Sequence, residues 1–454
     1  MMDASLAAKP AGVLKSTRVR YLILAMLFVI TMLNCADRAT LSLTGTAMRK
    51  EFGFSAVHMG YLFSAFSWAY VLAQVPAGWL LDRFGARRIY ASSLFFWSLF
   101  TLLQSTIGIV GSMAGAVTML FALRFLMGAA EAPAFPANAK VVMMWFPSSE
   151  RGTAAAIFNS AQYFAAVVFT PLMGWITHSI GWHAVYLVMG VAGFLLTFAW
   201  LRVMRQPGGH PWVNQAELDH IAGRDVSADA SAGAAAAPAE SARLDTWFYV
   251  RQLLCNRMLL GVYLGQYGVN VVTYFFLTWF PVYLVQTRGM TILKAGLVAS
   301  LPAICGFTGG VLGGMLSDAL IKRGYTLTVA RKVPIVGGML LSGVIIGCNY
   351  VSSDWLIVLL MSLAFFGKGV GALGWAVISD TAPNQAVGLS GSIFNTFGNI
   401  AGIVTPIVIG YLVAGSSGSF NGALVFVGAN ALLTVFCYLV IVKDIHRVEL
   451  RTRA

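Results

Sequence analysis

An acid and a base stand next to each other in the first long hydrophobic run of the chain. Asp37 and Arg38 lie in a run that starts at Tyr21. A charge at bilayer depth costs about 3 kcal/mol even on the gentler insertion scales, so it persists where it is paired, hydrated or functional. Neighbouring residues on a helix point about 100° apart, which predicts separate partners for the two. Both could instead belong to a structural ion pair with another span.

A second acid and base occupy the fourth hydrophobic run. Arg124 and Glu131 are two helical turns apart on one face, and Asn138 continues that face. Pro133 and Pro136 should disturb the helix there and leave carbonyls for water or a cation. An anionic substrate would compete with such carboxylates for arginine, so protonation of the acid would free the arginine for the anion. Alternatively, Arg124 and Glu131 only clamp the helices together.

A single lysine lies in the tenth run, within Phe-Phe-Gly-Lys-Gly. Lys368 shares a helical face with Trp375 and Ser379. A substrate with a carboxylate at each end would suit one arginine and a second cation, and we predict Lys368 in that role. The alternatives are a lysine that reaches toward the membrane surface or one that pairs with backbone carbonyls.

Uncharged polar side chains also fall inside hydrophobic runs. Such groups could bind hydroxyls of a polar substrate, and aromatic rings could cover its apolar faces; the alternative is hydrogen bonding between helices. The predicted substrate contacts of this kind are Tyr70, Gln162, Gln266, Tyr267, Asn270, Tyr274, Asn395 and Asn399.

The composition indicates a membrane protein with many spans. The chain has 454 residues, 58% hydrophobic and 10% charged, whereas a soluble protein has roughly a quarter charged residues. We predict an all-α membrane protein with twelve spanning helices, each about 20 apolar residues long. Their approximate limits are 21–44, 57–80, 88–108, 114–145, 153–177, 181–203, 258–285, 293–316, 328–350, 355–379, 387–413 and 420–442.

The basic residues predict the orientation. The net charge of +13 is explained by lysine and arginine on cytoplasmic loops and does not call for nucleic acid as a partner. With both termini in the cytoplasm, the opposite side receives only Arg49, Lys50, Arg288 and Lys294, and three further basic residues fall within spans. Residues 1–20 and 443–454 are then cytoplasmic tails.

A long loop divides the twelve runs into six and six. Residues 204–257 contain the Ala-, Ser- and Asp-rich tract Asp225–Ser241, whose composition predicts a flexible linker. Just before it, Asn214 could cap a short helix. The predicted units are therefore a six-helix bundle over 21–203, a cytoplasmic linker over 204–257 and a second six-helix bundle over 258–442.

The two halves repeat each other. Gly78-Trp-Leu-Leu-Asp82 after the second run corresponds to Gly314-Met-Leu-Ser-Asp318 after the eighth, and Gly152–Asn159 corresponds to Gly388–Asn395 at the same offset. Such repeats predict two similar halves related by an axis along the membrane normal, with a binding site between them near mid-membrane.

The first of these loops resembles the signature of the major facilitator superfamily. Its glycines allow a tight turn, and its charges could form a cytoplasmic latch that holds one conformation closed. The alternative is an ordinary basic turn. The residues of this predicted latch are Gly78, Asp82, Arg83, Gly85, Arg87, Arg88, Gly314 and Asp318.

A closer resemblance lies in six stretches: Asn34–Ser42, Arg124–Asn138, Trp145–Gly152, Phe158–Tyr163, Phe276–Pro281 and Phe366–Lys368. Through them the chain is similar to the anion:cation symporters within that superfamily, and among these to bacterial proton-coupled sugar-acid transporters. The resemblance implies import of sugar diacids of the glucarate and galactarate class by alternating access across the bacterial inner membrane. It implies that Arg38 binds a substrate carboxylate and that Asp37 carries a proton. The competition between substrate and acid for arginine adds Glu131 as a second proton-coupling acid. One departure is Cys35, where such transporters usually have tyrosine.

Other functions fit less well. A proton symporter of monocarboxylic sugar acids, aldonates or hexuronates, is the nearest alternative, and multidrug export is disfavoured by the cationic site residues. The sequence contains no filter-like repeat of the kind that would indicate a channel. The six histidines lie outside the polar centre or near span ends, and the five cysteines are scattered, so we expect no enzyme, metal site or cofactor. The expected partners are the organic anion, protons and lipid, with the chain as a monomer.

Overall fold

The computed structural model describes residues 16–222, 246–383 and 386–450, and in this part of the chain every regular element is helical. In the described residues, eleven helices are long and apolar enough to cross a membrane, or twelve if one bent pair counts as a single span. The bent pair is α10 (Arg257–Thr278) and α11 (Phe280–Gln286), which meet at 47°. The predicted all-α membrane fold is therefore confirmed. The predicted linker tract Asp225–Ser241 lies outside the described residues.

The first group of helices follows the predicted runs, but most of its members are longer. They are α1 (Val19–Phe52), α2 (Ala56–Phe84), α3 (Ala86–Leu103) with the 3-10 turn η1 (Gln104–Ile109), α4 (Met113–Glu131), α5 (Ala134–Trp145), α6 (Ser148–Ser179) and α7 (Trp182–Val203). The single run predicted over 114–145 is interrupted after Glu131, where Pro133 precedes α5. A proline lacks the N–H that the helix would use.

Three short helical pieces precede the second group. The short pieces are η2 (Pro207–Gly209), α8 (Gln215–Ile221) and α9 (Thr246–Cys255). Asn214 accepts a hydrogen bond from the Glu217 N–H and caps α8, as predicted. After α10 and α11 come α12 (Ile292–Lys322), α13 (Leu327–Ser342), η3 (Gly343–Tyr350), α14 (Asp354–Val370), α15 (Gly374–Thr381), α16 (Val387–Gly415), α17 (Asn421–Phe436) and the π-helical η5 (Cys437–Ile441).

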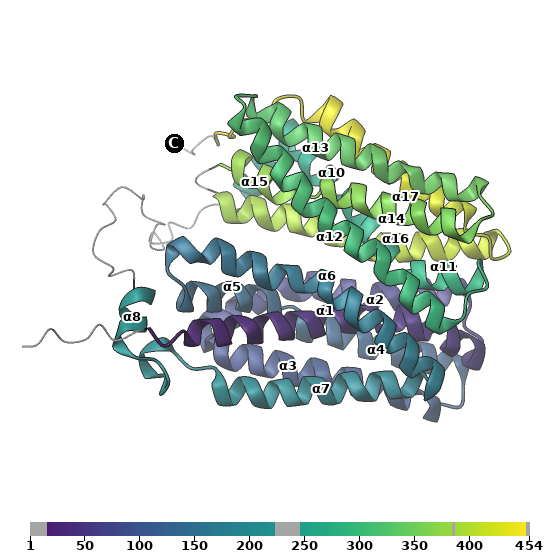
Figure 1. The fold of residues 1–454 in the computed structure, drawn as a ribbon. Coiled ribbons are helices and arrows are strands. Elements are labelled where there is room, and N and C mark those ends of the chain that lie inside the picture. Colours follow the sequence, from purple (N-terminus) through teal and green to yellow (C-terminus); the bar gives the residue numbers. More distant parts are fainter. Residues whose placement is uncertain (1–15, 223–245, 384–385, 451–454) are drawn as a thin grey trace, which may run out of the picture.

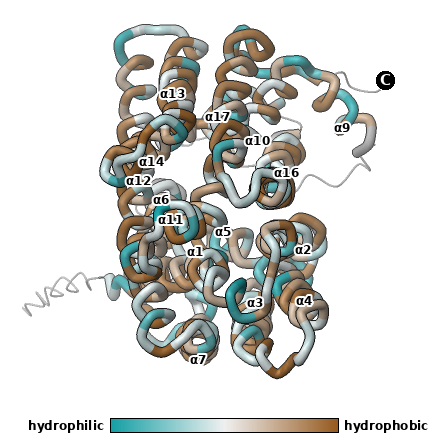
Figure 2. Tube along the Cα trace, turned by 90° about the vertical axis from the view of Figure 1, so that its right-hand side faces the viewer, coloured by the Kyte–Doolittle hydropathy of each residue, from teal (hydrophilic) through white to brown (hydrophobic). Residues whose placement is uncertain are grey.

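The helices gather into two bundles. In Figure 1, α1 to α7 lie together in the lower part and α10 to α17 in the upper part, and the end-on view of Figure 2 shows the same grouping. We call these the N-terminal and C-terminal bundles. Across the interface, α2 packs on α16 and α6 packs on α12. Helices α1 and α6 also pack on each other.

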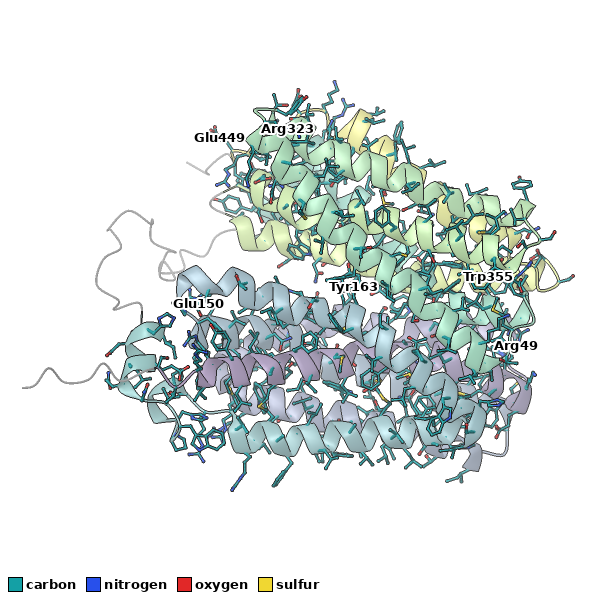
Figure 3. All side chains as sticks on the ribbon, viewed as in Figure 1. Arg49, Glu150, Tyr163, Arg323, Trp355 and Glu449 are labelled. Carbon is teal, nitrogen blue, oxygen red and sulfur yellow. The ribbon has the colours of Figure 1, made fainter. Side chains whose placement is uncertain are left out.

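The molecule has two ends along the helix axes. In Figure 3, Glu150, Arg323 and Glu449 lie at one end, Arg49 and Trp355 lie at the other, and Tyr163 lies midway. We call them the Glu150 end and the Arg49 end. Hydrogen bonds near the Arg49 end join the bundles. Arg49 Nη1 donates to Gln286 Oε1 at 2.7 Å, and the hydroxyls of Tyr61 and Tyr411 are 3.2 Å apart.

An ionic cluster fastens α8 to the Glu150 end. The fully buried carboxylate of Glu217 accepts the Val19 and Arg20 backbone N–H groups, each at 3.0 Å, and so caps α1 from a distant part of the chain. The Arg20 guanidinium bridges this carboxylate to Glu150 of α6, with an Nε–Oε2 distance of 3.1 Å. One acid thus holds the starts of α1 and α6 beside α8.

The electrostatics of Glu217 follow from these contacts. Burial opposes its charge, but hydrogen bonds from the Thr17 hydroxyl and the Arg20 and Val19 N–H groups, together with the Arg20 charge, hold the pKa of Glu217 below its ordinary value. A carboxyl whose pKa is lowered by folding adds stability above its unfolded pKa of about 4.3, and this stability is lost as the pH falls through the folded value.

We therefore expect Glu217→Gln to lower the thermal unfolding midpoint by several degrees at pH 7, because the capping charge is lost. The difference from the unchanged protein should shrink as the pH falls from the unfolded pKa of about 4.3 through the lower folded pKa of Glu217, where the carboxyl becomes neutral. Glu449→Gln, at an exposed glutamate, is the control. Equal midpoints for Glu217→Gln and Glu449→Gln at pH 7 would contradict the capping role.

Candidate functional site

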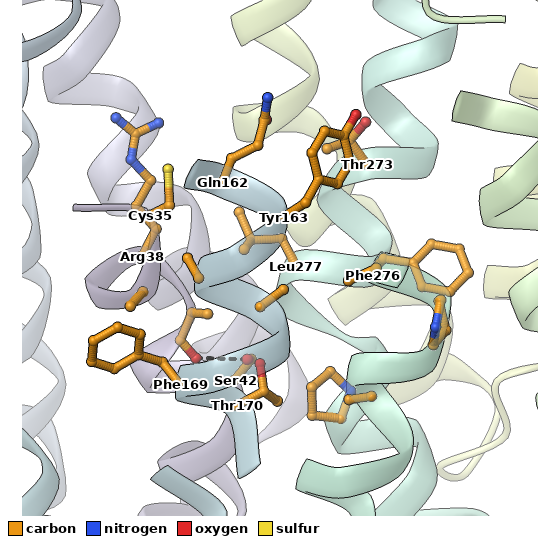
Figure 4. A pocket seen from close by; sticks show the side chains of 18 of the residues that line it. Cys35, Arg38, Ser42, Gln162, Tyr163, Phe169, Thr170, Thr273, Phe276 and Leu277 are labelled. Carbon is orange, nitrogen blue, oxygen red and sulfur yellow. Dashed lines mark hydrogen bonds between the residues drawn. The ribbon is translucent and has the colours of Figure 1, made fainter. Parts of the chain in front are cut away.

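A cavity of about 290 Å³ lies between the two bundles. Figure 4 shows Cys35 and Arg38 on α1, Gln162 and Tyr163 on α6, and Thr273 and Phe276 on α10 around it. The C-terminal bundle also contributes residues of α12 and α14. The remaining polar or aromatic lining residues are Ser42, Phe169, Thr170, Asn270, Tyr274, Phe365 and Lys368.

Two cations from different bundles line this cavity. Arg38 comes from α1, and Lys368 comes from α14. Lys368 is only 8% exposed, and its Nζ lies 5.1 Å from the centre of the Phe365 ring. Within the described residues no carboxylate forms an ion pair with Lys368. The cavity can therefore receive an anion, and it has a cation on each side.

Glycines explain how Lys368 reaches the cavity. A Cβ at Gly367 would lie 2.4 Å from the Gly338 carbonyl oxygen on α13, and a Cβ at Gly369 would lie 2.2 Å from the Gly306 oxygen on α12. These distances are closer than real Cβ contacts allow. The glycines around Lys368 thus let α14 fit between α12 and α13.

Arg38 is held from several sides. Its Nε donates to Glu131 Oε2 at 3.0 Å, and the Glu131 side chain is fully buried. The guanidinium carbon lies 4.7 Å from the centre of the Phe66 ring, 4.9 Å from that of Tyr70 and 5.7 Å from that of Phe135. The side chain of Arg38 is 16% exposed. It therefore joins a buried acid to the cavity.

One close helix contact sets this arrangement. A Cβ at Gly128 of α4 would lie 2.2 Å from the Phe66 carbonyl oxygen on α2. Because only glycine allows that approach, Phe66 and Tyr70 of α2 come close to Glu131, which follows Gly128 by one turn. The spacing of Gly128 and Glu131 along α4 thus brings the aromatic rings and the acid to the same arginine.

Asp37 faces away from Arg38, as the helical geometry predicts. Its carboxylate is fully buried and accepts a hydrogen bond from the indole N–H of Trp97 on α3. Arg124 does not pair with Glu131 in this structure; its Nε donates to the Leu62 carbonyl at 3.0 Å. Several buried polar atoms here lack a hydrogen-bond partner among the described residues: Asn34 Oδ1 and Nδ2, Asp37 Oδ1, Arg38 Nη2, Arg124 Nη1 and Glu131 Oε1.

The predicted site residues fall into three groups. Those that line the cavity are Arg38, Gln162, Asn270, Tyr274 and Lys368. Those that contact a lining residue are Tyr70, Glu131, Gln266, whose Nε2 is 3.4 Å from Asn270 Oδ1, and Asn399, whose Oδ1 accepts from Tyr274 at 3.3 Å. Those outside the lining are Asp37, Arg124, Tyr267, Trp375, Ser379 and Asn395. Trp375 is 55% exposed and packs on Phe394.

Sequence reasoning missed other residues. Tyr163 and Thr273 line the cavity, Phe66 and Phe135 contact Arg38, and Trp97 binds Asp37. Tyr163 adjoins the predicted Gln162, which is a weak signal. The aromatic residues resemble the many others in the hydrophobic runs, and their contacts depend on helix packing that no spacing rule reports.

The predicted latch residues lie apart from the cavity. Asp82 accepts from Lys140 Nζ at 2.9 Å, within the N-terminal bundle, and its side chain is 84% exposed. Gly85 has φ of +82°, which suits the tight turn between α2 and α3. The Arg83 guanidinium packs near the Trp79 and Phe84 rings, and Arg87 donates to the Leu201 carbonyl. A Cβ at Gly78 or Gly314 would meet no atom within 4 Å.

Known proteins resemble the chain along most of its length. The family model described as Major Facilitator Superfamily matches residues 27–330. The probable galactarate/D-glucarate transporter GudP of Bacillus subtilis is 61% identical over 444 residues, which cover 97% of this chain and 95% of the relative. The D-galactonate transporter of Escherichia coli O6:H1 is 39% identical over 439 residues, or 97% and 99% of the two chains.

A solved structure resembles the fold. The crystal structure of a D-xylose-proton symporter matches with a TM-score of 0.71 and 16% sequence identity, over 93% of this chain and 98% of that chain. At this identity the likeness concerns the fold alone.

The close approach of α2 and α4 at Gly128 predicts that one methyl group added there destabilises the protein. We expect Gly128→Ala to destabilise the protein by about 1–3 kcal/mol, as overpacking does, because the new Cβ meets backbone. Gly337→Ala, in a helix with open space around it, is the control and should not destabilise. Thermal unfolding in detergent checks both, and equal midpoints would contradict the packing argument.

Proposed function

This chain belongs to the Major Facilitator Superfamily, and we propose that it imports sugar diacids of the galactarate and glucarate class together with protons. The support is the relative named a galactarate/D-glucarate transporter, at 61% identity over 97% of this chain. Transport would proceed by alternating access, in which the two bundles rock around a site near mid-membrane.

The observation that carries the proposal is the pair of cations in one cavity. Arg38 and Lys368 both line it, from opposite bundles. A sugar diacid has a carboxylate at each end and hydroxyls between. Arg38 would bind one carboxylate through its planar fork, Lys368 would bind the other, and Gln162, Asn270 and Tyr274 would meet the hydroxyls.

A monocarboxylic sugar acid is the second candidate. The relative named a D-galactonate transporter is 39% identical over 97% of this chain. An aldonate would occupy the Arg38 side and leave Lys368 without a carboxylate. Lys368 is largely buried and forms no ion pair among the described residues. It therefore favours the diacid, since a buried charge without a partner is costly.

Proton coupling would follow from the Arg38–Glu131 ion pair. While Glu131 is ionised it occupies Arg38; a proton on Glu131 would release the guanidinium for the substrate carboxylate. Asp37 would carry a second proton. Moving one charge against the potential costs about 2.3 kcal/mol per 100 mV, so two protons would make the entry of a doubly charged anion electroneutral.

We also propose the orientation and the conformational cycle. The basic loops favour the Glu150 end as the cytoplasmic side, with two similar halves in a bacterial inner membrane. The hydrogen bonds between the bundles at the Arg49 end would then close the outer side. Asp82 and its neighbouring arginines, with Gly314 and Asp318, would form the cytoplasmic latch when the other side opens.

The diacid proposal predicts a selective role for Lys368. Lys368→Gln should weaken galactarate binding about tenfold or more, the loss of roughly 1.4 kcal/mol or more in one charge-assisted contact, and should affect galactonate little. Arg38→Gln should weaken both. Competition binding to purified protein measures this, and equal effects of Lys368→Gln on both ligands would favour the monoacid alternative.

The coupling proposal predicts a separation of transport modes. In proteoliposomes, an inward proton gradient should drive galactarate accumulation, and Asp37→Asn should abolish it. Exchange of internal for external galactarate should persist in Asp37→Asn, because exchange needs no net proton movement. Asp444→Asn, at an exposed position, is the control. Uptake that ignores the imposed gradient would overturn the proton-coupled proposal.

A further inference from the structure

We propose that Phe66, Tyr70 and Phe135 form an aromatic cradle that holds the Arg38 guanidinium ready for substrate while Glu131 carries a proton. This inference rests on the proposed function and assigns a positioning role to residues that the cavity lining does not include. When protonation removes the negative charge of Glu131, the two rings on α2 and the one on α5 would stabilise the positive charge of Arg38.

The geometry places ring faces against the cation. The guanidinium carbon is 4.7 Å, 4.9 Å and 5.7 Å from the three ring centres, all within the range of cation–π attraction, about 6 Å. The Phe66 and Tyr70 rings are 5.5 Å apart and nearly parallel, with 21° between their planes. Phe66 and Tyr70 are 4% and 5% exposed, so water does not screen the attraction.

The need for the cradle comes from the chemistry of arginine. A guanidinium does not lose its proton in proteins, so Arg38 stays charged throughout the cycle. Among the described residues, its one ion pair is with Glu131, and its Nη2 has no hydrogen-bond partner. When Glu131 is protonated and the cavity is empty, the arginine is a largely buried cation, 16% exposed, without a counter-charge, which is costly.

An aromatic cradle solves this problem without competing with substrate. A second carboxylate would stabilise Arg38 but would also occupy it, as Glu131 does. Ring faces attract the cation through their quadrupole and carry no net charge. They therefore leave the hydrogen-bond donors of the guanidinium free for an incoming carboxylate.

Other charged or titratable groups surround the arginine. These are Cys35 and Asp37 on α1, Tyr70 on α2, Arg124 and Glu131 on α4, Tyr274 on α10 and Lys368 on α14. Asp37 is bound by Trp97 on the other side of α1, and the remaining groups are cationic or ordinarily neutral. Protonation of Glu131 therefore leaves the three rings as the groups that stabilise the Arg38 charge.

A double-mutant cycle tests the proposal. Glu131→Gln mimics the protonated acid, and Phe66→Leu removes the ring but keeps an apolar side chain. At fixed pH, we expect Phe66→Leu to weaken galactarate binding on the order of fivefold in the Glu131→Gln background, the size of a cation–π contribution. Phe66→Tyr and Phe66→Trp should restore binding there, because they restore a ring face.

A substrate-free measurement separates this inference from the proposed function. Without galactarate, Phe66→Leu should lower the thermal midpoint more in the Glu131→Gln background than in the unchanged protein, where Glu131 still balances Arg38. Coupling in this measurement, together with no galactarate binding by the unchanged protein, would support the cradle and overturn the proposed substrate.

Phe63→Leu is the matched control on the same helix. Phe63 is similarly buried but packs on Trp279, so its effect should be equal in both backgrounds. If the Phe66→Leu variant does not fold, Phe135→Leu tests another ring of the cradle in the same way. The cradle is overturned if the losses from Phe66→Leu are the same in both backgrounds, or if Phe66→Tyr behaves like Phe66→Leu.

Discussion

A guanidinium that cannot be neutralised lies between a buried acid and a cavity, and much of the central structure serves this one charge. Glu131 balances it at 3.0 Å. Gly128 lets α2 approach α4 closely enough to bring Phe66 and Tyr70 to the same group. The helix breaks after Glu131, and α5, which begins after Pro133, brings Phe135 to the same guanidinium. Each feature lowers the cost of keeping a cation in an apolar region while one face of it stays available.

The second cation places a positive charge on the side of the cavity formed by the C-terminal bundle. Lys368 enters from the other bundle because glycines let α14 fit closely against its neighbours. A ligand held between Arg38 and Lys368 would bridge the bundles, so binding and the relative movement of the bundles would be linked. The bundles already meet through hydrogen bonds at the Arg49 end, and a bridging anion would add a contact at mid-depth.

The sequence predicted the site residues whose type is unusual for their position in a hydrophobic run. Charges in hydrophobic runs identified Arg38 and Lys368, and helical spacing correctly separated Asp37 from Arg38. Proline positions predicted the break after Glu131. Spacing along one helix placed Arg124 with Glu131, but Arg124 instead donates to the Leu62 carbonyl of α2. Trp97, Phe66 and Phe135 were missed because an aromatic residue in an apolar run has no distinguishing pattern until packing gives it a partner. The bend between α10 and α11 was missed, although Pro281 at the start of α11 is the same kind of signal as Pro133.

The most direct test of the account is the number of protons taken up when galactarate binds. Calorimetry of the purified protein in buffers with different ionisation enthalpies measures it without a membrane potential. If the substrate carboxylate replaces Glu131 at Arg38, binding near neutral pH should take up protons, and Glu131→Gln should bind galactarate with a smaller uptake. Galactarate binding with no proton uptake, or with the same uptake in Glu131→Gln, would contradict the exchange of carboxylates at Arg38.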